Sequence, residues 1–388
     1  MASIVLKLAM AVISILLLGP LVGGLLSGTD RFLSARMQRR QGPPVLQPFY
    51  DISKFFQKKA YIVNGLQHFL VVGHLLFLML SIGIIYAGQD ILLSVFSLTL
   101  AEMMLCLAAF SASAPYSNMS AQREMLQMAC AEPILLLLCI GLYLSSGSFL
   151  VKDIIRCDLP AIVKTPGIFF AFLIVLPIEL RKSPFDVSTS HHAHQEMVKG
   201  VTTDISGSVL GIVELSEWYE LFLMVTLTGL FFIYSNPVSL VYAILAALIV
   251  LFGLTLCDNV FPRVRWERML AFTWGTTLVA GGGNMLILML LIRTITEPLR
   301  LLARSANEVA AGNFDIHLSE TGSRDELPRH ALQLAKLGVP LNLGLLGFLL
   351  DRLRADALQL THRPALLHGE VRQLNLALAV HSNQLIRG

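Results

Sequence analysis

Carboxylates that lie inside apolar stretches are the side chains of this sequence best suited to chemistry. Glu102 lies in SLTLAEMMLCLAAF, and Glu132 lies in LQMACAEPILLLLCI directly before Pro133. A charge at the centre of a bilayer costs at least ~2.5 kcal/mol on insertion scales, so such residues are seldom kept without a use. Because Pro133 also removes a backbone hydrogen bond and opens room for water, the pattern indicates proton transfer inside a membrane, with structural ion pairing as the alternative.

A second concentration of titratable groups lies between Glu179 and Glu220. The acidic residues and histidines of this segment are Glu179, Asp186, His191, His192, His194, Glu196, Asp204, Glu214, Glu217 and Glu220. Carboxylates drawn out of water exchange protons near neutral pH, and histidine titrates in the same range. Together these groups could pass protons between solvent and the membrane interior, and a solvated loop is the alternative.

Metal binding has little support in the sequence. The neighbouring histidines at 191, 192 and 194 can bind zinc, but no fourth ligand follows at a recognisable spacing. The five cysteines form no C-x-x-C pair, which argues against a zinc or iron–sulfur site built by this chain alone. The sequence also contains no glycine-rich phosphate loop and no nucleophile motif. We therefore expect no catalytic residue, metal or cofactor on this chain.

The elements that position these groups are predicted to be membrane-spanning helices. Of the 388 residues, 55% are hydrophobic and only 14% are charged, whereas soluble domains carry ~25% charged residues. Apolar blocks long enough to cross a bilayer as helices lie at 4–26, 67–88, 91–112, 127–147, 166–180, 219–235, 238–257 and 270–292. We therefore predict an all-α polytopic membrane protein with about eight transmembrane helices. The net charge of +3 is too small to favour nucleic-acid binding.

The basic residues of the predicted loops set the orientation. Lys and Arg gather in the loops after the first, third, fifth and seventh spans, which places these loops in the cytoplasm and the N-terminus outside. The segment PFYDISKFFQKK at 48–59 places Phe49, Ile52, Phe55 and Phe56 on one helical face. This segment is predicted to be an amphipathic helix on the membrane surface, with an ordinary linker as the alternative.

Four motifs, in the correct order, resemble subunit 1 of complex I, the NADH dehydrogenase subunit 1 family. They are ARMQRRQGPPVLQPFYDISKF, SNMSAQREMLQMACAEPILL, IELRKSPFDVSTSHHAHQEMVKGVTTDISG and DNVFPRVRW, and together they cover residues 1–292. Complex I proper usually has an acidic A-E-x-E run where this chain has HHAH. The histidine-rich version and the later Trp-Tyr-Glu look more like the membrane subunits of energy-converting [NiFe] hydrogenases and formate hydrogenlyase.

This resemblance implies a membrane-anchor and proton-path subunit of a redox-driven ion-translocating complex in the inner (plasma) membrane. Such a subunit lies beneath a peripheral arm and beside antiporter-like membrane subunits. The chain would be part of a translocating oxidoreductase without an active site of its own. NiFe and iron–sulfur centres, or quinone, would be bound in or at partner subunits, and the missing A-E-x-E acids count against a quinone site.

The resemblance also implies roles for individual residues. The expected proton path consists of Glu102, Arg123, Glu132, Glu179, Asp186, Glu196, Asp204, Glu214 and Glu220. The residues expected to dock the peripheral arm are Arg39, Arg40, Asp51, His191, His192 and His194.

The C-terminal part departs from this family. ITEPLRLLARSANEVAAGNF, followed by GSRDEL, resembles a HAMP signalling linker, and we predict a HAMP-like helical segment at 293–337. The Leu-, Ala-, Arg- and His-rich remainder, 338–388, is predicted to be a helical or disordered tail without an assignable role. This resemblance leaves a membrane sensor as the alternative to the ion-translocating subunit, and a stand-alone ion transporter is a third reading.

The predicted topology conflicts with a signalling role for this tail. Eight spans that start from an outside N-terminus leave residue 293 outside, whereas HAMP linkers are cytoplasmic. Either one span is miscounted or the tail is a fusion or gene-model join, and we favour the join.

Overall fold

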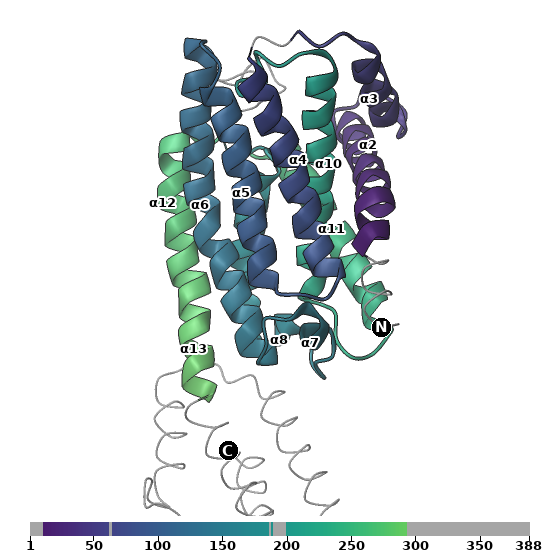
Figure 1. Cartoon of the computed structure of the whole chain (residues 1–388). Helices are drawn as coiled ribbons and strands as arrows, with labels where there is room; N and C mark the ends of the chain where they lie inside the picture. Colours follow the sequence, from purple (N-terminus) through teal and green to yellow (C-terminus); the bar gives the residue numbers. More distant parts are fainter. Residues whose placement is uncertain (1–10, 62–63, 186–187, 189–198, 293–388) are drawn as a thin grey trace, which may run out of the picture. The chain divides into compact units, whose positions relative to one another are not determined.

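Helices form all the regular elements of the described residues. The computed structural model describes residues 11–61, 64–185, 188 and 199–292 (Figure 1). Its elements are η1 (Ser14–Leu18), α2 (Gly19–Met37), α3 (Gln47–Gln57), α4 (Gly65–Tyr86), α5 (Ile91–Phe110), α6 (Pro115–Ser146), α7 (Val151–Ile155), α8 (Ala161–Lys164), α9 (Pro166–Glu179), α10 (Gly207–Leu230), α11 (Ser239–Val260), α12 (Trp266–Thr276), η2 (Thr277–Gly282) and α13 (Gly283–Leu291). The predicted all-α class is confirmed.

Six stretches of helix are long and apolar enough to cross a membrane. They are Ala11–Met37, Gly65–Tyr86, Ile91–Phe110, Pro115–Ser146, Ser239–Val260 and Trp266–Leu291. The remaining two predicted spans correspond to α9, which is apolar but has only 14 residues, and to α10, which has 24 residues and carries three glutamates. A polytopic membrane protein is therefore confirmed, whereas the count of eight spans stays a prediction.

Two helices begin well before the apolar blocks that marked them in the sequence. α6 starts at Pro115 instead of 127, and α10 starts at Gly207 instead of 219. With 32 residues, α6 is about 48 Å long, whereas the hydrocarbon core is ~30 Å thick. Polar first turns therefore extend beyond the apolar block. As a consequence, the acidic segment between Glu179 and Glu220 is only partly a loop, because Glu214 and Glu220 lie on α10.

The basic loops meet at one end of the helix bundle. Contacts at this end are Gln38 Nε2 to Asn259 Oδ1 at 2.8 Å, Asn64 Nδ2 to the Ser111 carbonyl at 3.3 Å, and the Val264 N–H to the Pro184 carbonyl at 2.7 Å. Contacts at the opposite end are the Ile91 N–H to the Phe149 carbonyl at 3.0 Å and the Ser235 N–H to the Cys157 carbonyl at 2.9 Å. This separation agrees with the predicted alternation of the loops.

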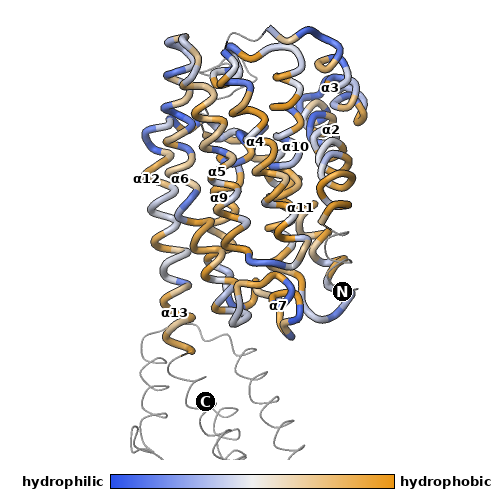
Figure 2. Tube along the Cα trace, in the orientation of Figure 1, coloured by the Kyte–Doolittle hydropathy of each residue, from blue (hydrophilic) through white to orange (hydrophobic). Residues whose placement is uncertain are grey.

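Apolar side chains fill the interior between α4, α5, α6, α9 and α10 and also cover the outside. Leu78, Leu98, Leu138 and Phe172 are completely buried. On α11, Ile249 remains 62% exposed, and apolar residues dominate α11 and the middle of the bundle, whereas the end with α3 is more hydrophilic (Figure 2). A surface of this kind is suited to lipid or to other membrane helices.

Close packing at the basic end fixes α2 and α3 against α10. A Cβ atom on Gly23 of α2 would lie 2.3 Å from the Trp218 carbonyl oxygen of α10, so no larger residue fits there. Phe49 of α3 packs edge-on against the ring of Trp218 with centroids 4.9 Å apart. The predicted amphipathic helix is therefore present as α3, and it lies against α2 and α10 (Figure 1).

Residues 293–388, which contain the predicted HAMP-like segment and tail, lie outside the described residues. The predicted domain boundaries at 292 and 337 stay predictions.

Candidate functional site

Three carboxylates from three helices meet in the interior. Glu102 comes from α5, Glu179 is the last residue of α9, and Glu220 comes from α10. One oxygen of each lies within 4.8 Å of the others, and the three residues are 5%, 6% and 2% exposed. Glu102 belongs to the inward face of α5, together with the buried Leu98 and Leu105, and this face explains its burial. We call Glu102, Glu179 and Glu220 the carboxylate triad.

Arg181 joins the carboxylate triad to α6. Its Nη1 donates to Glu220 Oε2 at 2.8 Å and its Nη2 to Glu124 Oε1 at 2.9 Å. The backbone of Arg181 has a φ of +50°, a left-handed conformation that non-glycine residues rarely adopt, and it turns the chain sharply after α9. Burial alone would lower the pKa of the guanidinium, but the carboxylates of Glu220 and Glu124 raise it well above its ordinary value. Arg181 therefore stays charged.

Glu124 also holds the segment that follows α9. Its Oε2 accepts a hydrogen bond from the Ser188 hydroxyl, and the Ser188 backbone N–H donates to Gln127 Oε1 at 2.8 Å. Glu124 and Gln127 lie one turn apart on the buried face of α6. The interior of the bundle is thus tied to the loop that contains the predicted arm-docking histidines.

Hydrogen bonding in the carboxylate triad is incomplete. One oxygen of Glu102 lies within 4.8 Å of one oxygen of Glu179, and two ionised carboxylates this close together repel, which favours a proton on one of them. Glu102 Oε1 and Glu220 Oε1 are buried and have no hydrogen-bond partner among the described residues. These oxygens are free to accept a proton or another ligand.

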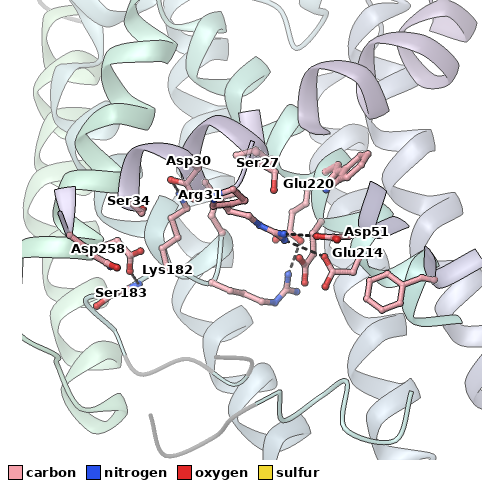
Figure 3. Close-up of a pocket in the computed structure, with 18 of the residues that line it drawn as sticks. Ser27, Asp30, Arg31, Ser34, Asp51, Lys182, Ser183, Glu214, Glu220 and Asp258 are labelled. Carbon is pink, nitrogen blue, oxygen red and sulfur yellow. Dashed lines mark hydrogen bonds and ion pairs between the residues drawn. The ribbon is translucent and has the colours of Figure 1, made fainter. Parts of the chain in front are cut away.

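A polar cavity of about 660 Å³ lies between α2, α3, α10 and the segment 180–183. Ion pairs line it: Arg31 with Asp51 at 3.4 Å, Arg31 with Glu214 at 3.7 Å, and Lys182 with Asp30 at 2.6 Å (Figure 3). Arg181 and Glu220 line both this cavity and the small space around the carboxylate triad. The two sites are therefore contiguous.

Several residues predicted from the sequence do belong to this arrangement. Glu102, Glu179 and Glu220 form the carboxylate triad. Glu214, Asp51 and Arg40 line the polar cavity. The carboxylate triad and Glu214 were predicted for the proton path, whereas Arg40 and Asp51 were predicted for arm docking. Residues of both predictions therefore lie in one continuous region.

Other predicted residues lie away from this region. The Arg123 guanidinium lies 5.8 Å from the ring centroid of Trp266, Asp204 accepts from the Ser117 hydroxyl at 2.5 Å, Glu132 is half-buried on α6, and Arg39 is exposed. Asp186, His191, His192, His194 and Glu196 lie outside the described residues. The roles predicted for all of these residues stay predictions.

Two residues at the centre of this site, Glu124 and Arg181, were not predicted from the sequence. Glu124 lies three residues before Gln127 and seven before Ala131, both buried, so extending the helical periodicity of α6 toward its N-terminus would have placed it on the inner face. Arg181 was counted only as a basic loop residue. Nothing in its local sequence indicates that carboxylates from α6 and α10 surround it.

An apolar helix bundle with a charged cavity and buried carboxylates defines a polytopic membrane protein with ionisable groups in its interior. The chain belongs to the NADH dehydrogenase family, whose model matches residues 8–289. A HAMP domain model matches residues 290–329. Both resemblances drawn from the sequence are thereby confirmed.

Known proteins of this family support the assignment. Hydrogenase-4 component C of Escherichia coli is 27% identical over 71% of this chain and 94% of its own length. NADH-ubiquinone oxidoreductase chain 1 of Mycosarcoma maydis is 27% identical over 63% of this chain and 84% of its own length. The solved structure of the membrane-bound sulfane sulfur reductase, an archaeal respiratory membrane complex, contains a chain with the same fold, at a TM-score of 0.64 and 23% identity over 73% of this chain and 99% of that chain.

Proposed function

We propose that this chain is a membrane subunit of a redox-driven ion-translocating complex of the energy-converting hydrogenase or complex I kind, located in the inner (plasma) membrane. In this complex it docks the peripheral electron-transfer arm and relays protons. The observation that carries the proposal is the contiguity of the polar cavity, Arg181 and the carboxylate triad. The electron carriers belong to partner subunits in this proposal, and antiporter-like subunits adjoin it in the membrane.

The proton enters the relay at the polar cavity. Glu214 and Glu217 line this cavity on α10, and Glu220 follows at the same three-residue spacing toward the interior. Residues three apart are neighbours on a helix surface, so a proton taken from cavity water by Glu214 passes along this row to Glu220. From there the oxygens of Glu179 and Glu102 lie within 4.8 Å.

The carboxylate triad suits proton transfer because its members are chemically alike. A neighbouring carboxyl and carboxylate can exchange a proton with little change in free energy, and oxygens of Glu102 and Glu179 lie within 4.8 Å of each other. Exclusion from bulk water prevents the proton from escaping to solvent. Arg181, held by Glu124 and Glu220, restricts how many of these carboxyls carry a proton at one time.

The segment after α9 couples docking of the arm to proton transfer. Lys182 Nζ donates to Asp30 Oδ1 at 2.6 Å, and the Ser183 N–H donates to Asp258 Oδ1 at 3.0 Å. These contacts hold residues 182–183 to α2 and α11, directly beside Arg181. A displacement of this segment by the arm would move the guanidinium relative to Glu220 and so alter the charge of the carboxylate triad.

Substitution of the carboxylate triad in the complete complex tests the relay. Glu220→Gln and Glu102→Gln should each reduce proton translocation per electron at least about tenfold in sealed vesicles, while the complex still assembles and transfers electrons. The second variant does not disturb Arg181. Glu267→Gln, an exposed carboxylate at the basic end, is the matched control and should behave as wild type. Unchanged translocation in both triad variants would refute the relay.

A membrane sensor is the second candidate function, favoured only by the HAMP match at 290–329. A chain that ends at residue 292 separates the two candidates. The relay proposal expects translocation by this shortened chain to equal that of the full chain. A response to an external stimulus that requires residues 293–388, with no proton translocation by either chain, would instead support the sensor.

A further inference from the structure

The interior carboxylates outnumber the positive charges that neutralise them. Four carboxyls, from Glu102, Glu124, Glu179 and Glu220, line one small space, and Arg181 is the only cation among its described lining residues. With all four ionised and Arg181 charged, the net charge is −3, and one proton on any of the carboxyls still leaves −2. Isolated charges are costly away from water, so the site must take up positive charge, either as protons or as a cation.

Two oxygens of the carboxylate triad are available to a ligand. Glu102 Oε1 and Glu220 Oε1 have no hydrogen-bond partner among the described residues, although both residues are more than nine-tenths buried. A buried acceptor without a partner costs ~1–3 kcal/mol. A ligand that contacts both oxygens would remove this cost and supply the missing charge.

The small space that Glu102, Glu179 and Glu220 help to line fits one small particle. It has a volume of about 10 Å³, which approaches the lower limit for a single water. A cation that enters must therefore leave most of its water behind and take the carboxylate oxygens instead. Glu220 also lines the larger cavity (Figure 3), through which such an ion can arrive.

We propose that the carboxylate triad binds one Na⁺ ion in competition with protons. Mg²⁺ keeps several of its waters and Ca²⁺ takes six to eight oxygens, more than the two buried carboxylate oxygens without a partner in the described part of the chain supply. A single positive charge is also repelled less than a double one by the neighbouring Arg181 guanidinium, which donates to Glu220 Oε2. Soft transition metals prefer nitrogen and sulfur ligands, and among the described lining residues the only such donor is the thioether of Met128. The larger K⁺ ion fits the space less well than Na⁺.

Competition with protons follows from the chemistry of the same oxygens. A protonated carboxyl loses most of its attraction for a cation, so Na⁺ and the proton exclude each other at Glu102 and Glu220. This inference deepens the proposed function, since it names an ion that the relay residues take. The binding itself does not require that the relay operates.

Equilibrium binding of ²²Na⁺ to the purified complete complex tests the proposal. We expect saturable binding of one ion per chain that weakens as the pH falls, with Li⁺ competing better than K⁺. Glu102→Gln removes one ligand without touching Arg181, and it should weaken the affinity at least about tenfold, which corresponds to about 1.4 kcal/mol. Glu267→Gln should bind as wild type does.

The same measurements separate this proposal from the relay. Equal Na⁺ binding by wild type and Glu102→Gln, or no saturable binding by wild type, overturns the Na⁺ site. Should Glu102→Gln fail to assemble, Glu179→Gln carries the same expectation. Proton translocation in vesicles that contain choline instead of Na⁺ tests the relay alone, so translocation that persists there without any Na⁺ binding would sink the ion site and leave the relay standing.

Discussion

The polar cavity and the carboxylate triad both carry charged side chains, but they balance them differently. In the cavity Arg31 pairs with Asp51, their side chains being 38% and 31% exposed, and Lys182 pairs with Asp30. In the interior Arg181 and Glu220 are 11% and 3% exposed, and the carboxyls exceed the cations. In the polar cavity, opposite charges nearly balance, which suits a hydrated entrance. In the interior, the excess of buried carboxyls must be neutralised by mobile protons or cations.

The largest expected effect comes from removal of the interior cation. Arg181→Ala leaves Glu124 and Glu220 buried without a counter-charge, and breaking a buried pair in this way costs ~3–5 kcal/mol. We expect the variant chain to be depleted from membranes, or to unfold at a clearly lower temperature in the detergent-solubilised complex. Arg181→Met combined with Glu124→Gln and Glu220→Gln removes the cation together with the two carboxylates that it pairs with, and it should restore assembly but not translocation.

Assembly of Arg181→Ala at wild-type level would contradict the difference in burial between the polar cavity and the interior. It would mean that water reaches Glu124 and Glu220 as freely as it reaches the polar cavity.

An intermediate effect is expected at the junction of the two regions. Lys182 and Asp30 are 14% and 29% exposed, and Asp30 Oδ1 also accepts from the Thr255 hydroxyl at 2.6 Å. Lys182→Met should lower the free energy of unfolding by ~1–2 kcal/mol, between the values for an exposed pair and a buried charged hydrogen bond. The thermal midpoint of the solubilised complex measures it, with Lys54→Met on the exposed side of the same cavity as control.

The sequence located the interior carboxylates better than it located their partners. Glu102 interrupts an apolar run and is conspicuous, and its burial agrees with the prediction. Glu132 is equally conspicuous, yet it shares its side of α6 with the exposed Met125 and Leu136. Hydropathy identifies a carboxylate within a span, but the direction that it faces depends on which helices pack beside it.

The helix ends and Arg181 also show that hydropathy does not reveal which residues lie against each other. The first turns of α6 are polar, and Glu214 and Glu217 interrupt the N-terminal half of α10, so the apolar blocks stopped short of Glu124 and Glu214. Arg181 lies among basic loop residues that all support the same orientation. Its position against Glu124 and Glu220 arises from three helices that are distant in the sequence, and a single sequence carries no record of that contact.

The smallest expected effect belongs to Arg31, and it sharpens the comparison most directly. Its guanidinium contacts Asp51 at 3.4 Å and Glu214 at 3.7 Å in the partly exposed cavity, and exposed pairs contribute only ~0–1 kcal/mol. Arg31→Ala should therefore leave assembly intact and lower the thermal midpoint slightly at low salt. At ~1 M salt, where the screening length is ~3 Å, the difference from wild type should vanish. A salt-independent loss as large as that of Arg181→Ala would show that the cavity is part of the dry interior, and proton entry from hydrated Glu214 would then have no physical basis.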